Sequence, residues 1–280
     1  MIAAFILIGD FIMSNIIEKD LSPTPAWKVG SVSKALSILG CFDQEHRELT
    51  LNDLNKALGL PKSTLLNLIR TLEAEDYITH KNQGKSYTLG YKILELAYFL
   101  HSSMPIGRYA LPVMEDLQAL SDENIYLTTH IRGRVLYLEA LYPNRRNVKY
   151  SISGKTLPMH CTSSGKIMLS HLPKEEVEGI IARWGLQSFT PNTIVDKDTL
   201  FKELELDKAR GYSIDIEEES LGVKCVAVAV RNSSGRAVGA LSISGSVLSM
   251  SNDLIPKYAM ELSKACNILS DYAELFPSEQ

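Results

Sequence analysis

The sequence has few cysteines and lacks any pairing pattern among them. Its four cysteines in 280 residues are far apart and include no CxxC pair. They are Cys41, Cys161, Cys225 and Cys266. A disulfide framework is therefore excluded, and a reduced, cytoplasmic protein is the natural expectation.

The sequence also lacks an apolar run long enough to cross a membrane. The opening stretch MIAAFILIGDFIM is interrupted by Asp10, has no basic flank and is too short to span a bilayer. The polar residues that follow contain Pro23 and Pro25, which are typical of an irregular segment. We expect residues 1–27 to form a flexible arm and expect no membrane partner.

An excess of positive charge is missing as well. The net charge is −4, and residues 28–90 carry eight basic and seven acidic side chains, or +1, which leaves −5 for the rest. The chain therefore cannot bind nucleic acid through bulk positive charge. Any DNA affinity must come from individually placed charges and from doubling of the binding module.

Residues 50–89 have the pattern of two short helices joined by a tight turn and followed by a two-stranded ribbon. Thr50 is a good N-cap, and Asp53 three residues later is placed for a capping box. Gly59 can adopt the positive φ that ends a helix, and Pro61 suits the start of the next one. This order predicts a winged helix-turn-helix, which lays one helix in the major groove of DNA.

The second of these helices has an apolar face and an opposite polar face. The apolar residues at helical spacing are Leu65, Leu68, Ile69 and Leu72. The opposite face carries residue types that contact phosphates and base edges. The predicted DNA-binding residues are Lys62, Ser63, Thr64, Leu66, Asn67 and Arg70 on this helix, with Lys81 and Lys85 at the ribbon tip. An ordinary helical hairpin would show the same periodicity, and the adjoining ribbon argues against that alternative.

Two further helices flank this region. Ser31 is predicted to cap a helix whose apolar stripe comprises Val32, Ala35, Leu36, Leu39 and Phe42. Residues 90–103 are predicted to be helical and are apolar on nearly every side, so this helix must be buried on several faces. Packing against its copy in a dimer would bury it, and burial within one subunit would do so too.

The remainder of the chain has an α+β pattern. A helix with Tyr109, Val113, Leu117 and Leu120 is followed by strands predicted at 125–131, 135–142 and 148–152. Helices at 162–172, 174–184 and 196–210 precede strands at 212–217, 224–230 and 237–244, and a last helix runs over 253–273. An antiparallel sheet with helices on it is a suitable frame for a small-molecule pocket.

Three segments resemble the IclR family of bacterial transcription regulators. LPMHCTSSGKIMLSHL (157–172) is similar to the family's LPxHxTAxGKAxLA segment. ARGYSIDIEEESLGVKCVAVAVRNSSGRAVGALSISG (209–245) is similar to its RxxGYAxDxEExxxGVxCxAxPVxDxxGxxxAAxSxSG signature, and VGSVSKALSILGCF (29–42) looks like its opening helix. The resemblance covers about residues 28–273, with the motifs in the family's order.

This resemblance implies a homodimer or homotetramer with a winged helix-turn-helix, a linker helix and a GAF-like effector domain. The corresponding ranges are 1–27 for the arm, 28–89 for the DNA-binding domain, 90–104 for the linker helix and 105–280 for the effector-binding domain. Family members bind palindromic double-stranded DNA operators, and small metabolites, often carboxylates or aromatic acids, alter that binding. For this chain it implies a regulator, expected to be a repressor, that is not an enzyme and needs no cofactor.

The resemblance also implies which residues contact the effector. They are Asp215, Cys225, Ser242 and Ser244, together with Ser163 and Ser164 at the start of the 162–172 helix. Backbone N–H groups at a helix start attract a carboxylate, and serine hydroxyls both donate and accept hydrogen bonds. Ser163 and Ser164 stand where the family more often has Gly or Ala, which indicates a tighter and more polar pocket.

The reading helix departs from the family pattern at one pair of residues. Leu66-Asn67 stand where the family usually has His-Arg or Tyr-Arg. Leu66 can meet a thymine methyl group and Asn67 an adenine edge. The operator is therefore expected to differ from those of relatives with the arginine.

Other constellations in the sequence point to other functions. Ser163–Lys166 satisfies S-x-x-K without an S-D-N or K-T-G partner, and Cys225 with His160 is a conceivable thiol pair. His160, Cys161 and Cys225 lack the spacing of a zinc site, so no metal is predicted. An enzyme or sensor domain with an appended helical module thus stays open as the alternative to a DNA-binding regulator.

Overall fold

The computed structural model describes residues 27–43, 45–143 and 152–277. The chain divides into two compact units, Met1–Ser103 and Met104–Gln280, called unit 1 and unit 2 below. Both mix helices and antiparallel strands, so the α+β class predicted from the sequence is confirmed. Among the described residues, no helix is both long enough and apolar enough to span a membrane.

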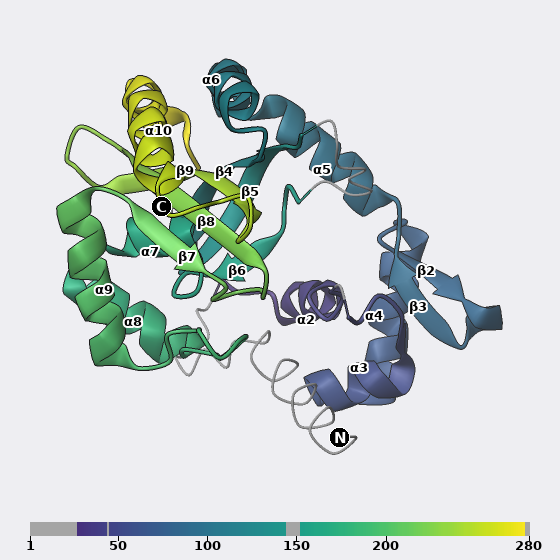
Figure 1. The fold of residues 1–280 in the computed structure, drawn as a ribbon. Helices are drawn as coiled ribbons and strands as arrows, with labels where there is room; N and C mark the ends of the chain where they lie inside the picture. Colours follow the sequence, from purple (N-terminus) through teal and green to yellow (C-terminus); the bar gives the residue numbers. More distant parts are fainter. Residues whose placement is uncertain (1–26, 44, 144–151, 278–280) are drawn as a thin grey trace. The chain divides into compact units, whose positions relative to one another are not determined.

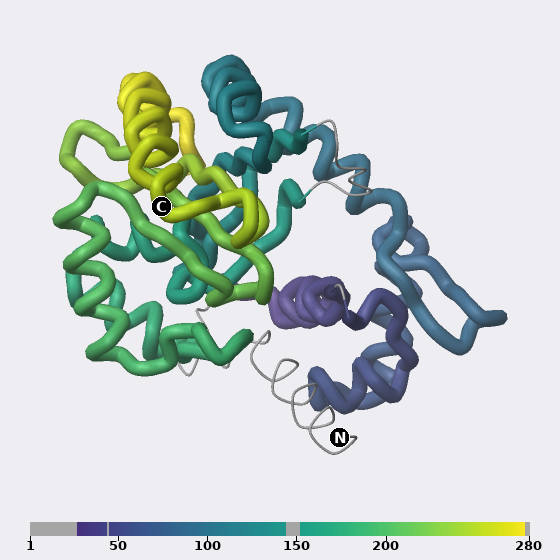
Figure 2. Tube along the Cα trace, viewed as in Figure 1, coloured from purple at the N-terminus to yellow at the C-terminus, as the bar shows by residue number. Residues whose placement is uncertain are grey.

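Unit 1 is a small helical body with a β-hairpin arm (Figures 1 and 2). Its elements are α2 Gly30–Leu39, β1 Leu49–Thr50, α3 Leu51–Leu58, α4 Lys62–Ala74, β2 Ile78–Lys81, β3 Ser86–Leu89 and α5 Lys92–Ser103. The predicted ribbon is β2 and β3, and β1 adds a third antiparallel strand on the other side of β3. This layout is that of a winged helix-turn-helix.

The turn between α3 and α4 follows the predicted local chemistry. The Asp53 N–H donates to the Thr50 hydroxyl, and the Asp53 carboxylate accepts from the Thr50 N–H, which completes the capping box. Gly59 ends α3 with a left-handed φ of 64°. Pro61 then directly precedes α4, so both helix ends are as predicted.

The first helix differs from its prediction. Helix α2 begins at Gly30, with Val29 as its N-cap, and no side chain caps it, so the cap assigned to Ser31 is wrong. Val32 and Leu36 are exposed, and Ile38 is the residue that α2 buries completely. The apolar side chains of α3 and α4 pack on the Ile38 side of the helix, and Ala35, Leu39 and Phe42 of the predicted stripe are partly buried against the same core.

Unit 2 is one antiparallel sheet with helices on both faces (Figure 1). Its elements are α6 Ile106–Ser121, β4 Asn124–Ile131, β5 Arg134–Leu141, β6 Thr156–Pro158, α7 Ser163–Leu169, α8 Lys174–Trp184, α9 Lys197–Arg210, β7 Ser213–Ile216, β8 Val223–Arg231, β9 Ala237–Ser246 and α10 Leu254–Ser270. In the described ranges the strand order is β6-β5-β4-β9-β8-β7.

Alternating side chains along β8 separate the two faces of the sheet. Val226, Val228 and Val230 point into a core made with α6 and α10. Ala227 and Ala229 lie on the opposite face, where α7, α8 and α9 pack. Small residues on this second face let the short helix α7 approach the sheet closely. That face is where the ligand-sized space of unit 2 is found.

Two predictions for unit 2 need correction. In α6 the buried residues are Ile106, Ala110, Met114 and Leu117. The predicted stripe is therefore correct at Leu117 and at Val113, which packs beside the core, and wrong at Tyr109 and Leu120, which are exposed because α6 turns its Ile106 side toward the sheet. Edge strand β6 was not predicted. The strand predicted at 148–152 lies outside the described residues except for Ile152, which is not in a strand.

Candidate functional site

The polar face of α4 is a continuous exposed surface. Ser63, Asn67 and Arg70 are exposed, because Leu65 and Ile69 turn the other side of the helix into the core. Lys62 is also exposed, and Thr64 and Leu66 are half-buried. The structure therefore brings the six residues predicted on this helix onto one stretch of helix, with Arg, Asn and Ser available to a partner surface.

The hairpin arm carries the other two predicted DNA-binding residues. Lys81 and Lys85 are exposed on either side of a tip in which Asn82, Gln83 and Gly84 all have positive φ. At the base of the tip, Glu48 accepts hydrogen bonds from the side chains of Asn82 and Ser86. A hydrogen bond between the His80 ring and the Glu73 carboxylate joins the arm to α4. The two lysines are thus held at a defined place relative to the helix.

Unit 2 contains a cavity of about 300 Å³ on the α7 face of its sheet. All six predicted effector residues line it: Ser163 and Ser164 from α7, Asp215 from β7, Cys225 from β8, and Ser242 and Ser244 from β9. They come from segments up to about 80 positions apart in the sequence. The size lies at the lower end of the range for small-molecule sites.

One wall of the cavity is the start of α7. The Thr162 side chain caps this helix by accepting from the Gly165 N–H at 3.1 Å. A Cβ on Gly165 would lie 2.2 Å from the Met159 carbonyl oxygen, so only glycine allows this close packing. Ser163 and Ser164 are 2% and 3% exposed. The helix has only seven residues. We therefore assign the polar character of this wall to the serine hydroxyls and not to the helix N-terminus.

The floor of the cavity is formed by small side chains of β8 and β9. The Cys225 thiol donates to the Ser244 hydroxyl at 3.1 Å, and the two residues are directly opposite in the sheet register. Burial raises the pKa of the Cys225 thiol well above its usual value, with the Asp215 charge adding to the effect. The thiol is therefore neutral, and the thiolate needed for nucleophilic catalysis is disfavoured.

Asp215 is a buried carboxyl at the edge of the cavity. It is 3% exposed, and one of its oxygens accepts from the Glu218 N–H at 2.8 Å. Burial raises its pKa from 3.8 to about 7, and the nearby Glu218 charge contributes to the rise, whereas the Glu218 N–H opposes it. Asp215 can therefore exist in either protonation state near neutral pH.

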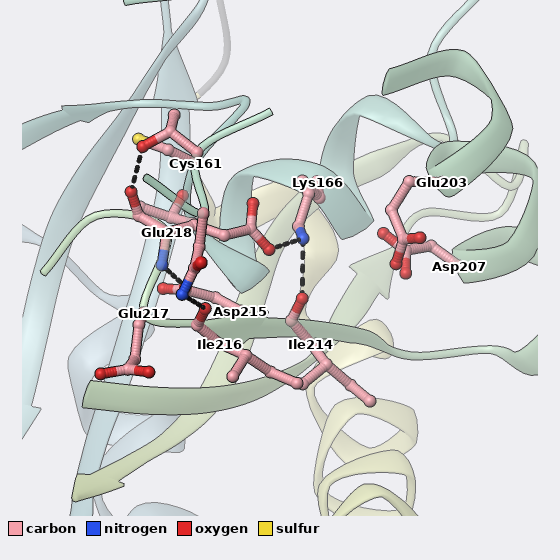
Figure 3. A network of polar contacts seen from close by, with 12 residues as sticks. Cys161, Lys166, Glu203, Asp207, Ile214, Asp215, Ile216, Glu217 and Glu218 are labelled. Atoms are coloured by element: carbon pink, nitrogen blue, oxygen red, sulfur yellow. Dashed lines mark hydrogen bonds and ion pairs between the residues drawn. The ribbon is translucent and has the colours of Figure 1, made fainter. Parts of the chain in front are cut away.

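The loop after β7 connects the cavity to a second polar cluster (Figure 3). Glu219 and Ser220 of this loop line the cavity, whereas Glu218 pairs with Lys166, a side chain that is 1% exposed. The Lys166 ammonium also donates to the Ile214 carbonyl oxygen at 2.7 Å. Burial raises the pKa of Glu218 despite the lysine. Lys166 is therefore the buried anchor of this cavity wall.

The loop after β7 is also held by the connection between α8 and α9. Thr193, in the connection between α8 and α9, donates its hydroxyl to the Glu218 carbonyl oxygen at 2.6 Å. Thr190 donates to the Glu217 carbonyl oxygen. Glu217 itself has a φ of +58°, a conformation that costs free energy for a non-glycine residue. These contacts fix the loop in one position.

The sequence interpretation missed several residues that line the cavity. Tyr126 and Tyr137 form an edge-to-face pair with ring centroids 5.2 Å apart, and Asn124 lies at the start of β4. Lys155 and Glu219 face each other at 4.0 Å. Alternation along the predicted strands could have assigned the tyrosines to one sheet face. Nothing in the sequence indicated that Lys155 lies at the cavity.

The residues of the alternative catalytic and zinc-site interpretations are engaged in other contacts. The His160 ring donates to the Gln187 carbonyl oxygen at 2.9 Å, and the Cys161 thiol contacts the Pro158 carbonyl oxygen. Lys166, the lysine of the S-x-x-K match, is committed to Glu218. In the ranges that the structure describes, no group of three or more His, Cys, Asp or Glu side chains is placed to hold a metal ion.

Comparison with known proteins gives matches over both units. The profile described as "IclR helix-turn-helix domain" matches residues 31–81, and "Bacterial transcriptional regulator IclR C-terminal" matches residues 99–271. The chain is 32% identical over 216 residues to the HTH-type transcriptional regulator XynR of Escherichia coli, covering 77% of this chain and 86% of the relative. It is 31% identical over 216 residues to the transcriptional repressor AllR of Escherichia coli, covering 77% and 79%.

A solved structure gives a similar result for the fold. The IclR homologue from Microbacterium hydrocarbonoxydans, complexed with 4-hydroxybenzoate, superposes with a TM-score of 0.69 at 24% identity. The superposition covers 87% of this chain and 99% of that one. At this identity the likeness concerns the fold of both units.

Proposed function

Because the chain belongs to the IclR family of bacterial transcriptional regulators, we propose that it is an operator-binding repressor released or recruited by a small carboxylate in unit 2. The observation that carries the proposal is the convergence of six serine, aspartate and cysteine side chains on one cavity. A ligand-sized, polar space in one unit and an exposed reading helix in the other are the two parts that such a regulator needs.

In the proposed mechanism, α4 lies in the major groove of double-stranded DNA. Arg70 and Lys62 neutralise phosphates, Asn67 pairs with an adenine edge and Leu66 contacts a thymine methyl group. The ribbon lysines Lys81 and Lys85 contact the backbone beside the groove. Support comes from the exposure of the polar face and from the ties that hold the arm to α4.

We propose that two copies bind a palindromic operator. Helix α5 buries none of its residues, and Leu94, Tyr98 and Leu100 are 65–68% exposed. An apolar helix of this kind gains stability by packing against a partner, and a second copy of the chain is the occupant that the symmetry of palindromic DNA favours. Two reading heads would then contact half-sites one helical turn apart, or multiples of it. Sedimentation analysis distinguishes such a dimer from a tetramer built of two dimers.

An enzymatic function is less well supported than regulation. The groups that catalysis would use are occupied, since Cys225 is a neutral thiol bonded to Ser244 and Lys166 is paired with Glu218. The named relatives are transcriptional regulators. We therefore propose a non-enzymatic regulator that acts in the cytoplasm, where bacterial DNA is accessible.

A mobility-shift titration on the DNA upstream of the protein's own gene tests the DNA-binding part. We expect the wild type to protect a palindrome, with affinity that falls as salt rises. The double variant Lys62→Ala/Arg70→Ala should lose most of this affinity, whereas Lys208→Ala, which removes an exposed lysine from α9, should not. A shift that persists in the double variant, without a protected palindrome, would rule the reading-head assignment out.

Thermal shift against small carboxylates tests the cavity assignment. A ligand that stabilises the wild type should stabilise Asp215→Ala and Cys225→Ala less, because both side chains line the cavity. The same ligand should change operator binding in the mobility-shift titration. Equal stabilisation of both variants would move the effector site elsewhere.

A further inference from the structure

The cavity in unit 2 presents hydroxyl groups that have no protein partner. Within the described chain, the Ser163, Ser164 and Ser242 hydroxyls make no hydrogen bond to protein, although all three residues are at least 97% buried. Buried hydroxyls normally find a partner, and each can donate one hydrogen bond and accept others. These three hydroxyls therefore offer donors and acceptors to a molecule with several polar atoms in the cavity.

The cavity also presents acceptors that need donors. Asp215 uses one oxygen to accept the Glu218 N–H, and its other oxygen has no partner among the described residues. Glu219 lies 4.0 Å from the Lys155 ammonium, which is a loose ion pair that leaves capacity for another contact. Because carboxylates accept and do not donate when ionised, a ligand that satisfies them must bring O–H or N–H groups.

The remaining surface of the cavity is aromatic and aliphatic. The rings of Tyr126 and Tyr137 meet edge to face, and Ile152, Leu157 and Val223 line the space beside them. The C–H faces of a carbohydrate-like chain pack on such rings while its hydroxyls point to the polar walls. A cavity of about 300 Å³ holds about ten water-sized groups at about 30 Å³ each, which is close to the size of a five- or six-carbon molecule.

From this lining we infer that the ligand is a polyhydroxylated monocarboxylic acid of five or six carbons, recognised through its hydroxyls by Ser163, Ser164, Ser242, Asp215 and Glu219. This inference rests on the proposed function, since it names the class of effector for the same cavity. Lys155, the one cation among the described lining residues, is the partner for the ligand's carboxylate.

An aromatic acid fits this lining less well. The 4-hydroxybenzoate of the Microbacterium homologue offers one hydroxyl and one carboxylate. In this cavity it would leave most of the serine hydroxyls and at least one of the two acidic side chains buried without a donor or acceptor. Unpaired buried polar groups weaken binding, so the hydroxyl pattern should discriminate strongly against it.

Isothermal titration of the full chain with four sets of probes tests the inference. The polyhydroxylated acids are D-gluconate, D-galactonate, D-xylonate and D-glucuronate; the neutral counterparts are D-glucitol, galactitol and xylitol. Hexanoate and pentanoate keep the carboxylate without hydroxyls, and 4-hydroxybenzoate is the aromatic acid. At least one polyhydroxylated acid should bind ten-fold or more tightly than its neutral counterpart and than every acid that lacks several hydroxyls.

Other results of this titration overturn the inference. Tighter binding of 4-hydroxybenzoate or hexanoate would show that hydroxyls are not what the cavity selects. Equal binding of a neutral alditol would remove the carboxylate from the assigned class. Binding by none of the probes at 10 mM would count against the class as a whole.

Variants locate the binding within the cavity. Ser242→Ala and Glu219→Gln should each weaken the best polyhydroxylated acid five-fold or more without changing the melting temperature of the free protein by more than a few degrees. Glu205→Gln, which alters an exposed carboxylate on α9, is the matched control and should bind like the wild type. Unchanged affinity in both cavity variants would refute the assignment.

The operator titration separates this inference from the proposed function. If a polyhydroxylated acid binds the cavity but leaves DNA binding unchanged, the ligand class stands and the proposed regulation fails. If an aromatic acid alters operator binding through the cavity, the regulation stands and the ligand class fails.

Discussion

The two candidate sites are built in opposite ways. The candidate DNA-binding surface of unit 1 is drawn largely from nine consecutive positions of α4, residues 62–70, most of which are exposed or half-buried. The cavity of unit 2 is drawn from residues between 124 and 246, most of them buried or half-buried. The reading residues take no part in a core, whereas several cavity residues also hold the fold together. Substitutions of the α4 residues should therefore change binding alone, whereas substitutions of the buried charged groups of unit 2, Lys166 and Asp215, should also change stability.

The largest effect is expected at Lys166, the buried anchor of the cavity wall. Lys166→Met should destabilise unit 2 by about 3–5 kcal/mol, because it leaves the Glu218 carboxylate buried without its cation. Urea unfolding followed by Trp184 fluorescence measures this, in a Trp27→Phe background that removes the tryptophan of unit 1.

A double variant distinguishes the loss of the ion pair from the loss of side-chain packing. Lys166→Met/Glu218→Leu should recover most of the loss, since an apolar pair replaces the ionic one. A single variant as stable as the wild type would contradict the role of Lys166 as an anchor. Operator binding by unit 1 should be unaffected at temperatures where unit 2 is folded.

The next effect concerns the buried carboxyl of Asp215 and its pH dependence. The pKa of Asp215 is raised to about 7, so the folded state keeps a proton that the unfolded state loses above pH 4. The destabilisation therefore grows as the pH rises from about 4 to about 7 and is constant above that. The variant Asp215→Asn keeps the acceptor for the Glu218 N–H and removes this pH-dependent destabilisation.

We expect Asp215→Asn to be more stable than the wild type by about 2–4 kcal/mol at pH 8, and this difference should fall to about 1 kcal/mol or less at pH 4.5. Urea unfolding of both proteins between pH 4.5 and 8 checks this difference. Asp207, whose pKa is raised to about 6 by burial, titrates in both proteins and cancels in the comparison. Lys166, Glu218 and Glu219 surround Asp215 and are unchanged. A difference that does not vary with pH would contradict the raised pKa.

Substitutions on the exposed face of α4 should weaken DNA binding without lowering stability. Asn67→Ala and Arg70→Ala should each weaken operator binding by about 1–3 kcal/mol, because each removes contacts to a base edge or a phosphate. Unfolding of unit 1 should change by less than about 0.5 kcal/mol, since both side chains are exposed.

Operator variants refine this comparison. Asn67→Ala should relax the preference at one adenine position, whereas Arg70→Ala should weaken all sequences alike if it contacts a phosphate. Fluorescence anisotropy with a set of single-base operator variants distinguishes the two patterns. Loss of stability equal to the loss of binding would mean that α4 is a structural helix only.

The smallest effect is expected at the capping box of α3. Thr50→Ala should destabilise unit 1 by about 1 kcal/mol, because the Asp53 N–H loses its acceptor. Hydrogen exchange of the α3 amides measures it, with Thr50→Ser as the control that keeps the hydroxyl. Protection unchanged in Thr50→Ala would show that the cap is redundant with the packing of Leu54.

These differences explain what the sequence could predict. The helix-turn-helix was predictable because its signals are local: the Thr50 cap, the Gly59 stop and the spacing of Leu65 and Ile69. The buried faces of α2 and α6 were predicted only in part, because several apolar residues compete for burial, and the position of the neighbouring elements decides which of them is covered. Local signals set where a helix begins and ends, and tertiary packing sets its rotation.

The cavity could be predicted only in part. Its serines, Asp215 and Cys225 came from a family resemblance, and the structure brings them together on one face of the sheet. Lys155 and Glu219 were missed because their positions depend on the path of connecting segments. The role of Lys166 was missed as well, since a lysine inside an apolar helix pattern gives no sign of a buried partner 52 residues further along.

The alternation along β8 and β9 has a consequence for how this protein can change. Valines 226, 228 and 230, with Leu241 and Ile243, fill the core against α10, while Cys225, Ser242 and Ser244 face the cavity from the same two strands. An exchange of one small cavity side chain for another therefore leaves the packing behind the sheet untouched. Ligand preference can drift through single substitutions at these positions, with each intermediate still folded.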